Sequence, residues 1–329
     1  MRGACLAAAA VTMAASGAAA APAPCQMQEI AELPIQFDHD RLLVEAQING
    51  RPARMIVDTG ATNTLIFRSS AAALGLPVQP LAGVKFYGVG GEAGAGEVRI
   101  ADFRVASFAA HDDDLLVSGR QPLGAELGLL GADFLLQRDI EFDVAGGKIR
   151  WFKTRGCSGD QVVYWGKTYS AARMVGSGAL RKIHVRVQLD GVPILAEMDT
   201  GAGGGSVLTP AAAARAGVTP ASKGVAEAGE THGLGLGQLQ TYVGVFQTFS
   251  FGPDETINNA QLRIADLFAA DKEVRLGSHI PAPAIDTPDM LLGADFFRSH
   301  RVYVSLGQRT VYVSYEGGPV FQTRPPPMP

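Results

Sequence analysis

The chain has 329 residues and a formal net charge of −4, and no lysine- and arginine-rich cluster stands out in its sequence. This balance gives no indication of a nucleic-acid footprint or a polybasic membrane patch. Hydrophobic residues make up 47% of the chain and charged residues 18%, which excludes a largely disordered protein and leaves enough apolar material for two domains. The 40 glycines favour a turn-rich, all-β protein.

The first 20 residues have the features of a secretory signal peptide. Arg2 precedes an alanine-rich apolar stretch, and small residues at 18–20 supply a cleavage site. This stretch is too short to span a bilayer, and no later run of 18 or more apolar residues occurs. We predict an exported bacterial protein, periplasmic or secreted, without a transmembrane segment. A weak N-terminal helix and lipoprotein processing at Cys25 are the alternatives.

Removal of residues 1–20 leaves two cysteines, Cys25 and Cys157. An even pair in an exported protein commonly forms a disulfide. Such a bond would tie the mature N-terminus to the segment that follows the first lobe, and two free thiols are the alternative.

The first half of the chain reads as a series of strands and turns. Residues 42–48 alternate as a strand, Asn49-Gly50 is a strong hairpin turn, and the return strand leads into Asp58. The order of the remaining predicted elements is a strand at 64–67, a short helix at 69–76, a glycine-rich hairpin at 86–91, and a final hairpin at 139–152.

The second half repeats this order. A hairpin at 183–198 turns at Asp190-Gly191 and leads into Asp199; a helix at 210–216, a glycine-rich hairpin at 232–237 and a final hairpin at 301–315 follow. Each half also contains Leu-Leu-Gly-Ala-Asp-Phe, at 129–134 and 291–296. The repeat predicts two homologous lobes, 21–155 and 179–316, with a linker at 156–178 and a disordered Pro-rich tail at 317–329.

The lobes differ in length. Asp58 lies 73 residues before Gly131, whereas Asp199 lies 94 residues before Gly293, so the second lobe carries 21 additional residues, which we place within 253–289.

The paired Asp-Thr-Gly-Ala motifs, each followed by a glycine-rich hairpin and a later Leu-Leu-Gly, resemble the retropepsin-like aspartic proteases over residues 40–155 and 180–315. The resemblance implies an all-β fold in which two homologous lobes form a pseudo-dimer around a central cleft. It also implies a monomer, because the chain looks like a retropepsin that has been duplicated and fused.

The resemblance further implies that Asp58 and Asp199 meet at the lobe interface and hold one water molecule, without a metal or other cofactor. Two carboxylates about 3 to 4 Å apart repel by roughly 4 kcal/mol, which corresponds to about three pKa units. One carboxylate is therefore the base while the other keeps a proton, and the pair titrates as a unit.

The neighbouring residues acquire roles from the same resemblance. The glycines leave room beside the carboxylates, the threonines brace the two loops, and the glycine-rich hairpins are flaps that close over a polypeptide bound as an extended strand. The support residues are Thr59, Gly60, Thr200 and Gly201, and the flap residues are Tyr87, Gly88, Val89, Gly90, Gly233, Leu234 and Gly235. Tyr87 either forms a hydrogen bond near the site or packs the flap.

The second motif departs from the family pattern, because it has one extra residue and three consecutive glycines at 203–205. The leading interpretation is an aspartic endopeptidase. A non-catalytic periplasmic peptide-binding module is the first alternative, and a dimer with sites between chains is the second.

Three further features receive structural interpretations. We expect Asp133 and Asp295 to cap the short helices that follow them. The acidic run at 111–114 is expected to be a charged loop rather than a metal site. The Gly88-Val89-Gly90-Gly91 segment lacks the spacing and the βαβ surroundings of a nucleotide-binding loop.

Overall fold

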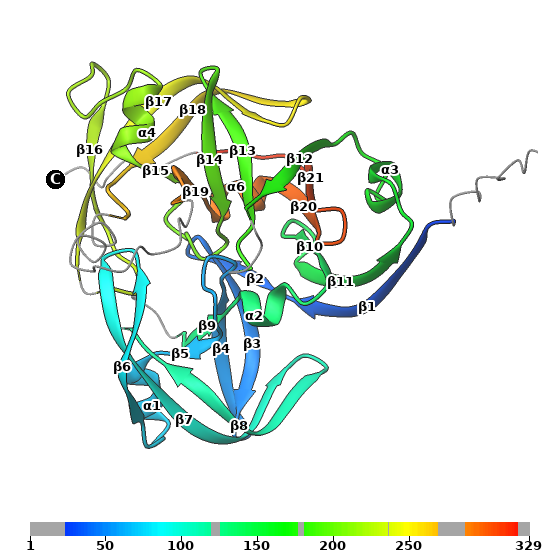
Figure 1. Ribbon diagram of the computed structural model, residues 1–329, viewed down its shortest axis with the longest axis vertical. Coiled ribbons are helices and arrows are strands. Elements are labelled where there is room, and N and C mark those ends of the chain that lie inside the picture. Colours follow the sequence, from blue (N-terminus) through cyan, green and yellow to red (C-terminus); the bar gives the residue numbers. More distant parts are fainter. Residues whose placement is uncertain (1–23, 120–125, 177–180, 236, 269–286, 322–329) are drawn as a thin grey trace, which may run out of the picture.

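The computed structural model describes residues 24–119, 126–176, 181–235, 237–268 and 287–321. Strands dominate it, and Figure 1 shows two lobes with a further group of strands beside them. The predicted signal peptide, residues 1–20, lies outside the described residues. Within the described ranges, no helix combines the length and the apolar character needed to cross a membrane.

The first lobe is an eight-stranded sheet in the order β2-β3-β4-β9-β5-β8-β7-β6. Its strands are β2 (Gln36–Asp38), β3 (Arg41–Ile48), β4 (Arg51–Val57), β5 (Leu65–Ile66), β6 (Gln79–Gly88), β7 (Gly91–Val105), β8 (Phe108–Val117) and β9 (Gly128–Leu130). Helix α1 (Arg68–Ala73) follows β5, and α2 (Ala132–Leu135) follows β9. Asn49 and Gly50 turn between β3 and β4 with positive φ angles, as a two-residue hairpin turn requires.

The second lobe repeats this connectivity. Its strands are β13 (His184–Leu189), β14 (Val192–Met198), β15 (Val207–Leu208), β16 (Ala226–Thr231), β17 (Leu239–Phe251), β18 (Glu255–Ile264) and β19 (Met290–Leu292), with helices α4 (Pro210–Arg215) and α6 (Ala294–Ser299). The order β13-β14-β19-β15-β18-β17-β16 matches β3-β4-β9-β5-β8-β7-β6 pairing for pairing. The all-β fold of two homologous lobes is therefore confirmed.

Much of the additional length of the second lobe lies between β18 and β19. Residues 265–289 separate these strands, whereas residues 118–127 separate β8 from β9. The interval falls within the range expected from the sequence, and residues 269–286 of it lie outside the described residues.

A central group of six strands joins the lobes in the order β1-β11-β10-β20-β21-β12. These strands are β1 (Gln26–Pro34), β10 (Asp139–Asp143), β11 (Lys148–Arg155), β12 (Ser170–Val175), β20 (His300–Ser305) and β21 (Thr310–Tyr315). The two halves of the chain meet where β10 pairs with β20, with Ile140 opposite Val304. The expected linker contains both β12 and a short helix, α3 (Gly159–Val162).

A disulfide fastens the edge of this central sheet. Cys25 lies just before β1 and is bonded to Cys157, just after β11, across a sequence separation of 132 residues. Since β1 pairs with β11 along its length, the bond closes a pair of strands that are already neighbours. The N-terminal strand is thereby held to the start of the segment between the lobes.

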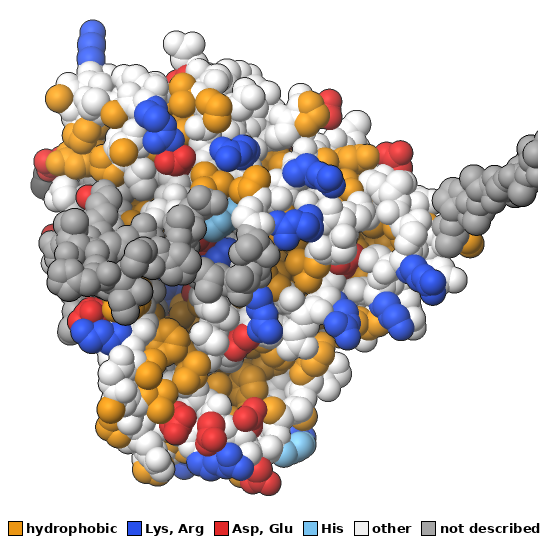
Figure 2. Space-filling view, viewed as in Figure 1, with side chains coloured by type: hydrophobic (Ala, Val, Ile, Leu, Met, Phe, Trp, Pro, Cys, Tyr) orange, Lys and Arg blue, Asp and Glu red, His pale blue; other side chains and the backbone are white. Residues whose placement is uncertain are grey.

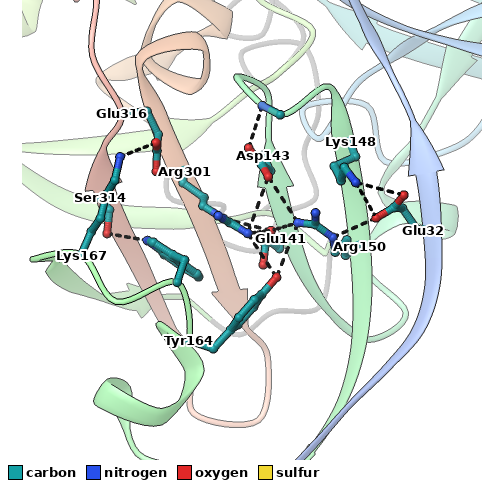
Figure 3. Close-up of polar contacts among 12 residues, drawn as sticks. Glu32, Glu141, Asp143, Lys148, Arg150, Tyr164, Lys167, Arg301, Ser314 and Glu316 are labelled. Carbon is teal, nitrogen blue, oxygen red and sulfur yellow. Dashed lines mark hydrogen bonds and ion pairs between the residues drawn. The ribbon is translucent and has the colours of Figure 1, made fainter.

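Buried charges connect the halves within the central sheet, as Figure 3 shows. The Glu141 side chain of β10 is inaccessible to solvent and lies between Arg150 of β11, at 2.5 Å, and Arg301 of β20, at 2.8 Å. The Arg301 guanidinium also stacks on the Trp165 ring, 4.6 Å from its centroid. Burial and then the bond to Glu141 raise the pKa of Tyr164 to about 12. Removing one partner of such a network would leave a buried charge uncompensated, which is strongly destabilising.

The disordered tail was expected to begin at residue 317, but the first five residues of that range are ordered. Residues 317–321 are described, and Phe321 is fully buried against the rings of Phe249 and Phe296. Burying a phenylalanine side chain contributes about 2 kcal/mol of favourable free energy, which helps to hold this short segment in place. Residues 322–329 lie outside the described part of the chain.

Charges on the face shown in Figure 2 are interleaved with neutral and apolar side chains over both lobes. The acidic run at 111–114 was expected in a loop, but it lies in β8. Pairing with β7 places His111 at 3.0 Å from Asp102 and Asp114 at 3.2 Å from Arg99. In the portions of the chain that the structure describes, no three His, Cys, Asp or Glu side chains are grouped to hold a metal ion.

Candidate active site

Each of the two aspartates follows the second strand of a hairpin and is anchored by the parallel strand beside it. Asp58 follows β4, and its backbone N–H donates to the carbonyl of Leu130, 3.0 Å away in β9. Asp199 follows β14, and its N–H donates to the carbonyl of Leu292, 2.9 Å away in β19. The two Leu-Leu-Gly runs therefore support the two aspartate loops from equivalent positions.

Two threonines hold the loops together across the lobe interface. Thr59 Oγ1 donates to the Met198 carbonyl at 2.7 Å and accepts from the Thr200 N–H at 3.0 Å. Thr200 Oγ1 donates to the Val57 carbonyl at 2.8 Å and accepts from the Thr59 N–H at 3.0 Å. Both threonines are fully buried, so each hydroxyl depends on the opposite lobe for its partners. This brace brings the two loops into contact within one chain.

The glycines after the threonines face the aspartate of the opposite lobe. A Cβ at position 60 would lie 2.5 Å from Cγ of Asp199, and a Cβ at position 201 would lie 2.3 Å from Cγ of Asp58. Both distances are shorter than any side chain tolerates. The crossed pattern shows that both carboxylates lie at one place between the two loops.

Burial and mutual repulsion change the acidity of the pair. Burial raises the pKa of Asp58, although the N–H of Ala61 and the charge of Lys182 oppose the change. Burial, and then the negative charge of Asp58, raise the pKa of Asp199 well above its usual range. A pair of this kind keeps one proton at a pH at which exposed aspartates are fully ionised, so it contains both a base and an acid.

Asp133 and Asp295 do not cap the short helices, contrary to expectation. The cap positions of α2 and α6 are Gly131 and Gly293, and neither helix has a side-chain cap. Each carboxylate accepts from the N–H of the next helix residue, and also from the hydroxyl and N–H of the residue that ends each aspartate loop. Thr64 Oγ1 lies 2.7 Å from Asp133, and Ser206 Oγ lies 2.7 Å from Asp295.

This match settles the register of the second loop. Because Ser206 makes the same contacts as Thr64, the extra residue of the second loop is accommodated within the three glycines before Ser206. Gly205 has a φ angle of +102°, which side-chain-bearing residues rarely adopt. Gly203 passes so close to the first lobe that a Cβ there would lie 2.7 Å from the Asp40 carbonyl. The glycine run therefore fits a tightly packed loop.

A partly buried lysine, with 21% of its side chain exposed, lies next to the aspartates and was not predicted. The ammonium group of Lys182 donates to the Gly60 carbonyl and to Glu197 Oε1, the latter at 2.6 Å. Burial opposes the charge on Lys182, but Glu197, Asp199 and Asp58 together raise its pKa. A permanent cation of the second lobe thus holds the loop of the first.

Glu197 connects this lysine to a histidine. His184 Nε2 lies 3.2 Å from Glu197 Oε2, and the two residues are register partners in the β13–β14 pair. Burial would raise the pKa of Glu197, but the contacts with His184 and Lys182 outweigh it and lower the pKa. The corresponding partners in the first lobe are Leu43 and Ile56. The sequence did contain a signal for this site, because the second repeat has an ionisable pair at the positions where the first repeat has an apolar pair.

The tips of the two glycine-rich hairpins meet. The N–H of Gly235 donates to the Val89 carbonyl at 3.1 Å, and the N–H of Gly237 donates to the Gly90 carbonyl at 2.8 Å. Gly88 faces Leu234 and Gly233 faces Val89, at distances that leave no room for a Cβ at position 233. Six of the seven predicted flap residues therefore lie at one junction. The seventh, Tyr87, is 47% exposed and has no hydrogen bond to the aspartates.

The flap of the first lobe also reaches the second lobe. Val89 packs against an apolar cluster that contains Val207 and Leu291, and Ala202, which follows the Asp199 motif, packs against the same cluster. The flap tip therefore lies over the second lobe's side of the aspartate pair.

Comparison with known proteins agrees with this geometry. No curated protein matches the chain. The model of the family described as aspartyl protease matches it twice, at residues 44–134 and 185–296. Each match spans one hairpin, its aspartate, its flap and its Leu-Leu-Gly run. The chain therefore belongs to the aspartyl protease family, with one copy of the family unit in each lobe.

Proposed function

We propose that this protein is an exported aspartic endopeptidase that hydrolyses peptide bonds with a water molecule held between Asp58 and Asp199. The observation that carries the proposal is the crossed placement of the two aspartates, each facing a glycine of the other lobe within one chain. The raised pKa values support it, because they give one carboxylate a proton while its neighbour is ionised.

The reaction takes place in two steps. The ionised aspartate removes a proton from water as the water oxygen bonds to the peptide carbonyl carbon, and the protonated aspartate gives its proton to the carbonyl oxygen. The resulting tetrahedral diol then loses its C–N bond: the first aspartate protonates the leaving nitrogen, and a diol hydroxyl returns a proton to the second. One peptide bond and one water become an acid and an amine, and the pair ends with its single proton.

The substrate binds as an extended strand between the aspartates and the flaps. Flap strands supply backbone donors and acceptors for strand addition, so affinity comes from the main chain and specificity from side-chain contacts. Because the flap tips contact each other and Val89 packs on the second lobe, they must separate before a peptide can enter.

The protein acts outside the cytoplasm and as a monomer in this proposal. The Cys25–Cys157 disulfide supports an oxidising compartment such as the periplasm or the medium. Both aspartates come from a single chain, so no second copy is needed to complete the site. The mass of the active species in solution tests the monomer, and N-terminal sequencing of the exported protein tests cleavage near residue 20.

The activity is tested by incubating the purified protein with a peptide mixture at pH values from about 3 to 7 and identifying products by mass spectrometry. Asp58→Asn and Asp199→Asn are each expected to lower kcat/KM at least about 1,000-fold, since either change removes the acid–base pair. Asp113→Asn is the matched control, because Asp113 is exposed in β8.

Three results would contradict the proposal in whole or in part. In the first, the wild-type protein cleaves no peptide faster than the two aspartate variants do. In the second, such a protein still binds peptides, which would favour the non-catalytic peptide-binding module. Full activity of one variant alone would show that the aspartates do not act as a pair.

A further inference from the structure

An apolar surface of the second lobe lies under the flap of the first. Its buried members are Val207, Ala265, Leu267 and Leu291. Ala202, immediately after the Asp199-Thr200-Gly201 motif, and the flap residue Val89 pack against it. A peptide held between the aspartates and this flap therefore passes along this surface.

Arg263 of β18 belongs to the same face. It is the register partner of Val207 in the parallel β15–β18 pair, and register partners point to the same side of a sheet. It also alternates with Leu262 and Ile264, which are fully buried in the main core on the opposite side. The side chain of Arg263 is accordingly on the side of the flap and the aspartates.

The guanidinium group of Arg263 reaches the loop that follows Asp199. A Cβ at position 204 would lie 3.2 Å from Nη1 of Arg263, so a larger residue at 204 would occupy the space beside the guanidinium. The central glycine of the run is thus explained by an approach to a positive charge.

Among the residues that the structure describes, Arg263 has no partner that would account for this charge. Its Nε is buried and has no hydrogen-bond partner, and no carboxylate of the described residues is within ion-pair distance of the guanidinium. An unsatisfied buried N–H of a charged group is costly, and partly buried arginines are normally paired. The counterpart of Arg263 in the first lobe is Leu116, which pairs with Leu65 as Arg263 pairs with Val207.

We infer that Arg263 binds a carboxylate of the substrate, so that the enzyme prefers peptides carrying Asp or Glu at one position on the second-lobe side of the cleft. The inference rests on the proposed peptidase function and adds a substrate class to it. Arginine matches a carboxylate through two parallel N–H donors, which gives geometric selectivity as well as affinity. A chain-terminal carboxylate has the same chemistry, and the test distinguishes the two sources.

The test starts from a peptide that the enzyme cleaves and that has Asp or Glu near the scissile bond. A second peptide has Asn or Gln in that place. Each is synthesised both with a free C-terminal carboxylate and as the C-terminal amide. For the wild type, neutralising the side chain is expected to lower kcat/KM about tenfold to one-hundredfold, as for one charge-assisted pair. Amidation is expected to have no effect. A loss on amidation alone would overturn the side-chain assignment in favour of the chain terminus.

The variants assign the preference to Arg263. Arg263→Leu introduces the residue found at this position in the first lobe. This variant should cleave the acidic and the neutral peptide equally fast, at the rate at which the wild type cleaves the neutral peptide. Arg263→Lys should retain part of the preference. Arg186→Leu, an exposed position in β13 of the same lobe, should leave it unchanged. If Arg263→Leu keeps the full preference, or if the wild type prefers no acidic residue at any position, the inference is wrong while the peptidase function stands.

Binding provides a readout that does not depend on catalysis. In the Asp58→Asn background, fluorescence anisotropy should show the acidic peptide binding about tenfold or more tightly than its neutral partner, and Arg263→Leu should abolish that difference. Equal binding of the two peptides in the Asp58→Asn background would overturn the inference even if no peptide were cleaved. Thermal melting confirms that each variant is folded.

Discussion

The two lobes agree in how they build the aspartate loops and differ in the charges around them. Both have a bracing threonine, a glycine that faces the opposite carboxylate, and a partly buried aspartate that holds the end of the loop. The second lobe alone places an ionisable pair, Glu197 with His184, and an arginine, Arg263, where the first has aliphatic residues. The residues that build the two aspartate loops are thus present in both lobes, whereas the charged residues around the site are present in the second lobe alone.

This difference shows what a fused chain gains over a dimer of identical chains. In a symmetric dimer a substitution changes both sides of the site at once. In a single chain one side can acquire a charge while the other keeps its apolar surface. The following experiments test where the lobes are equivalent and where they are not, beginning with the largest expected effect.

Gly60→Ala and Gly201→Ala should both abolish most activity. Each places a methyl group within 2.5 Å of the opposite carboxylate, which forces the two aspartates apart. A displacement of this size costs about 100-fold in kcat/KM. Gly307→Ala is the control, because a Cβ there meets no atom within 4 Å. If one of the two variants kept activity within about tenfold of the wild type, the crossed symmetry of the site would be disproved.

Thr59→Val and Thr200→Val should destabilise the protein by similar amounts. Each removes one donor and one acceptor from a buried network, at a cost of about 1 to 3 kcal/mol in the free energy of unfolding. The double variant should lose less free energy of unfolding than the sum of the two single losses, because each single change already leaves polar groups of the other lobe without partners. Denaturant titrations measure all three, with Thr256→Val as an exposed control. Unequal single effects would show that one lobe dominates the brace.

Lys182→Met and Glu197→Gln should move the pH–activity profile in opposite directions. Lys182 favours the ionised forms of the pair, so its removal raises the pKa values of the aspartates and shifts the profile upward. Glu197 raises the pKa of Asp199, so its neutralisation shifts the profile downward. Glu45→Gln, exposed in the first lobe, should not shift it. A shift of both variants in the same direction would contradict this electrostatic account.

Asp199→Asn should melt at a higher temperature than the wild type at pH 7. The raised pKa of Asp199 means that the folded state holds a proton that the unfolded state has already lost. Wild-type stability therefore falls as the pH rises from about 4 through that raised value. Removing the charge should gain about 1 kcal/mol, or about 2 to 4 °C, at pH 7 and nothing at pH 3. Calorimetry across this range tests it, and an equal gain at pH 3 would rule out a charge effect.

Local signals predicted the repeat, the strands and the aspartates. Asn49-Gly50 and Asp190-Gly191 are turn dipeptides that tight hairpins favour, and in each case the strand after the turn ends at an Asp-Thr-Gly. A second copy removes the ambiguity of a short motif, because both copies must occupy the same place in the fold. These features require only neighbours in sequence, which is why the lobes could be predicted without the structure.

The charges around the site depend on contacts between distant residues. The Lys182 contact with the Gly60 carbonyl spans 122 residues, and the approach of Arg263 to Gly204 depends on the register of β15 with β18. Asp133 was assigned to a cap because it lies near a helix start, but its carboxylate also accepts from Thr64, 69 residues away, which the sequence could not show. Phe321 was assigned to a disordered tail because its burial requires rings that come much earlier in the chain.

The position of Glu141 has a consequence for how the chain is made. Strand β10 pairs with β11 on one side, but its other neighbour, β20, begins only at His300. While the chain emerges, β10 is therefore an open edge that could pair with another nascent molecule. Asp139, Glu141 and Asp143 put three negative charges along that edge. Arg150 of β11 offsets part of this charge from the start. We expect the remaining charge to disfavour pairing with an identical strand until Arg301 of β20 supplies the second partner of Glu141.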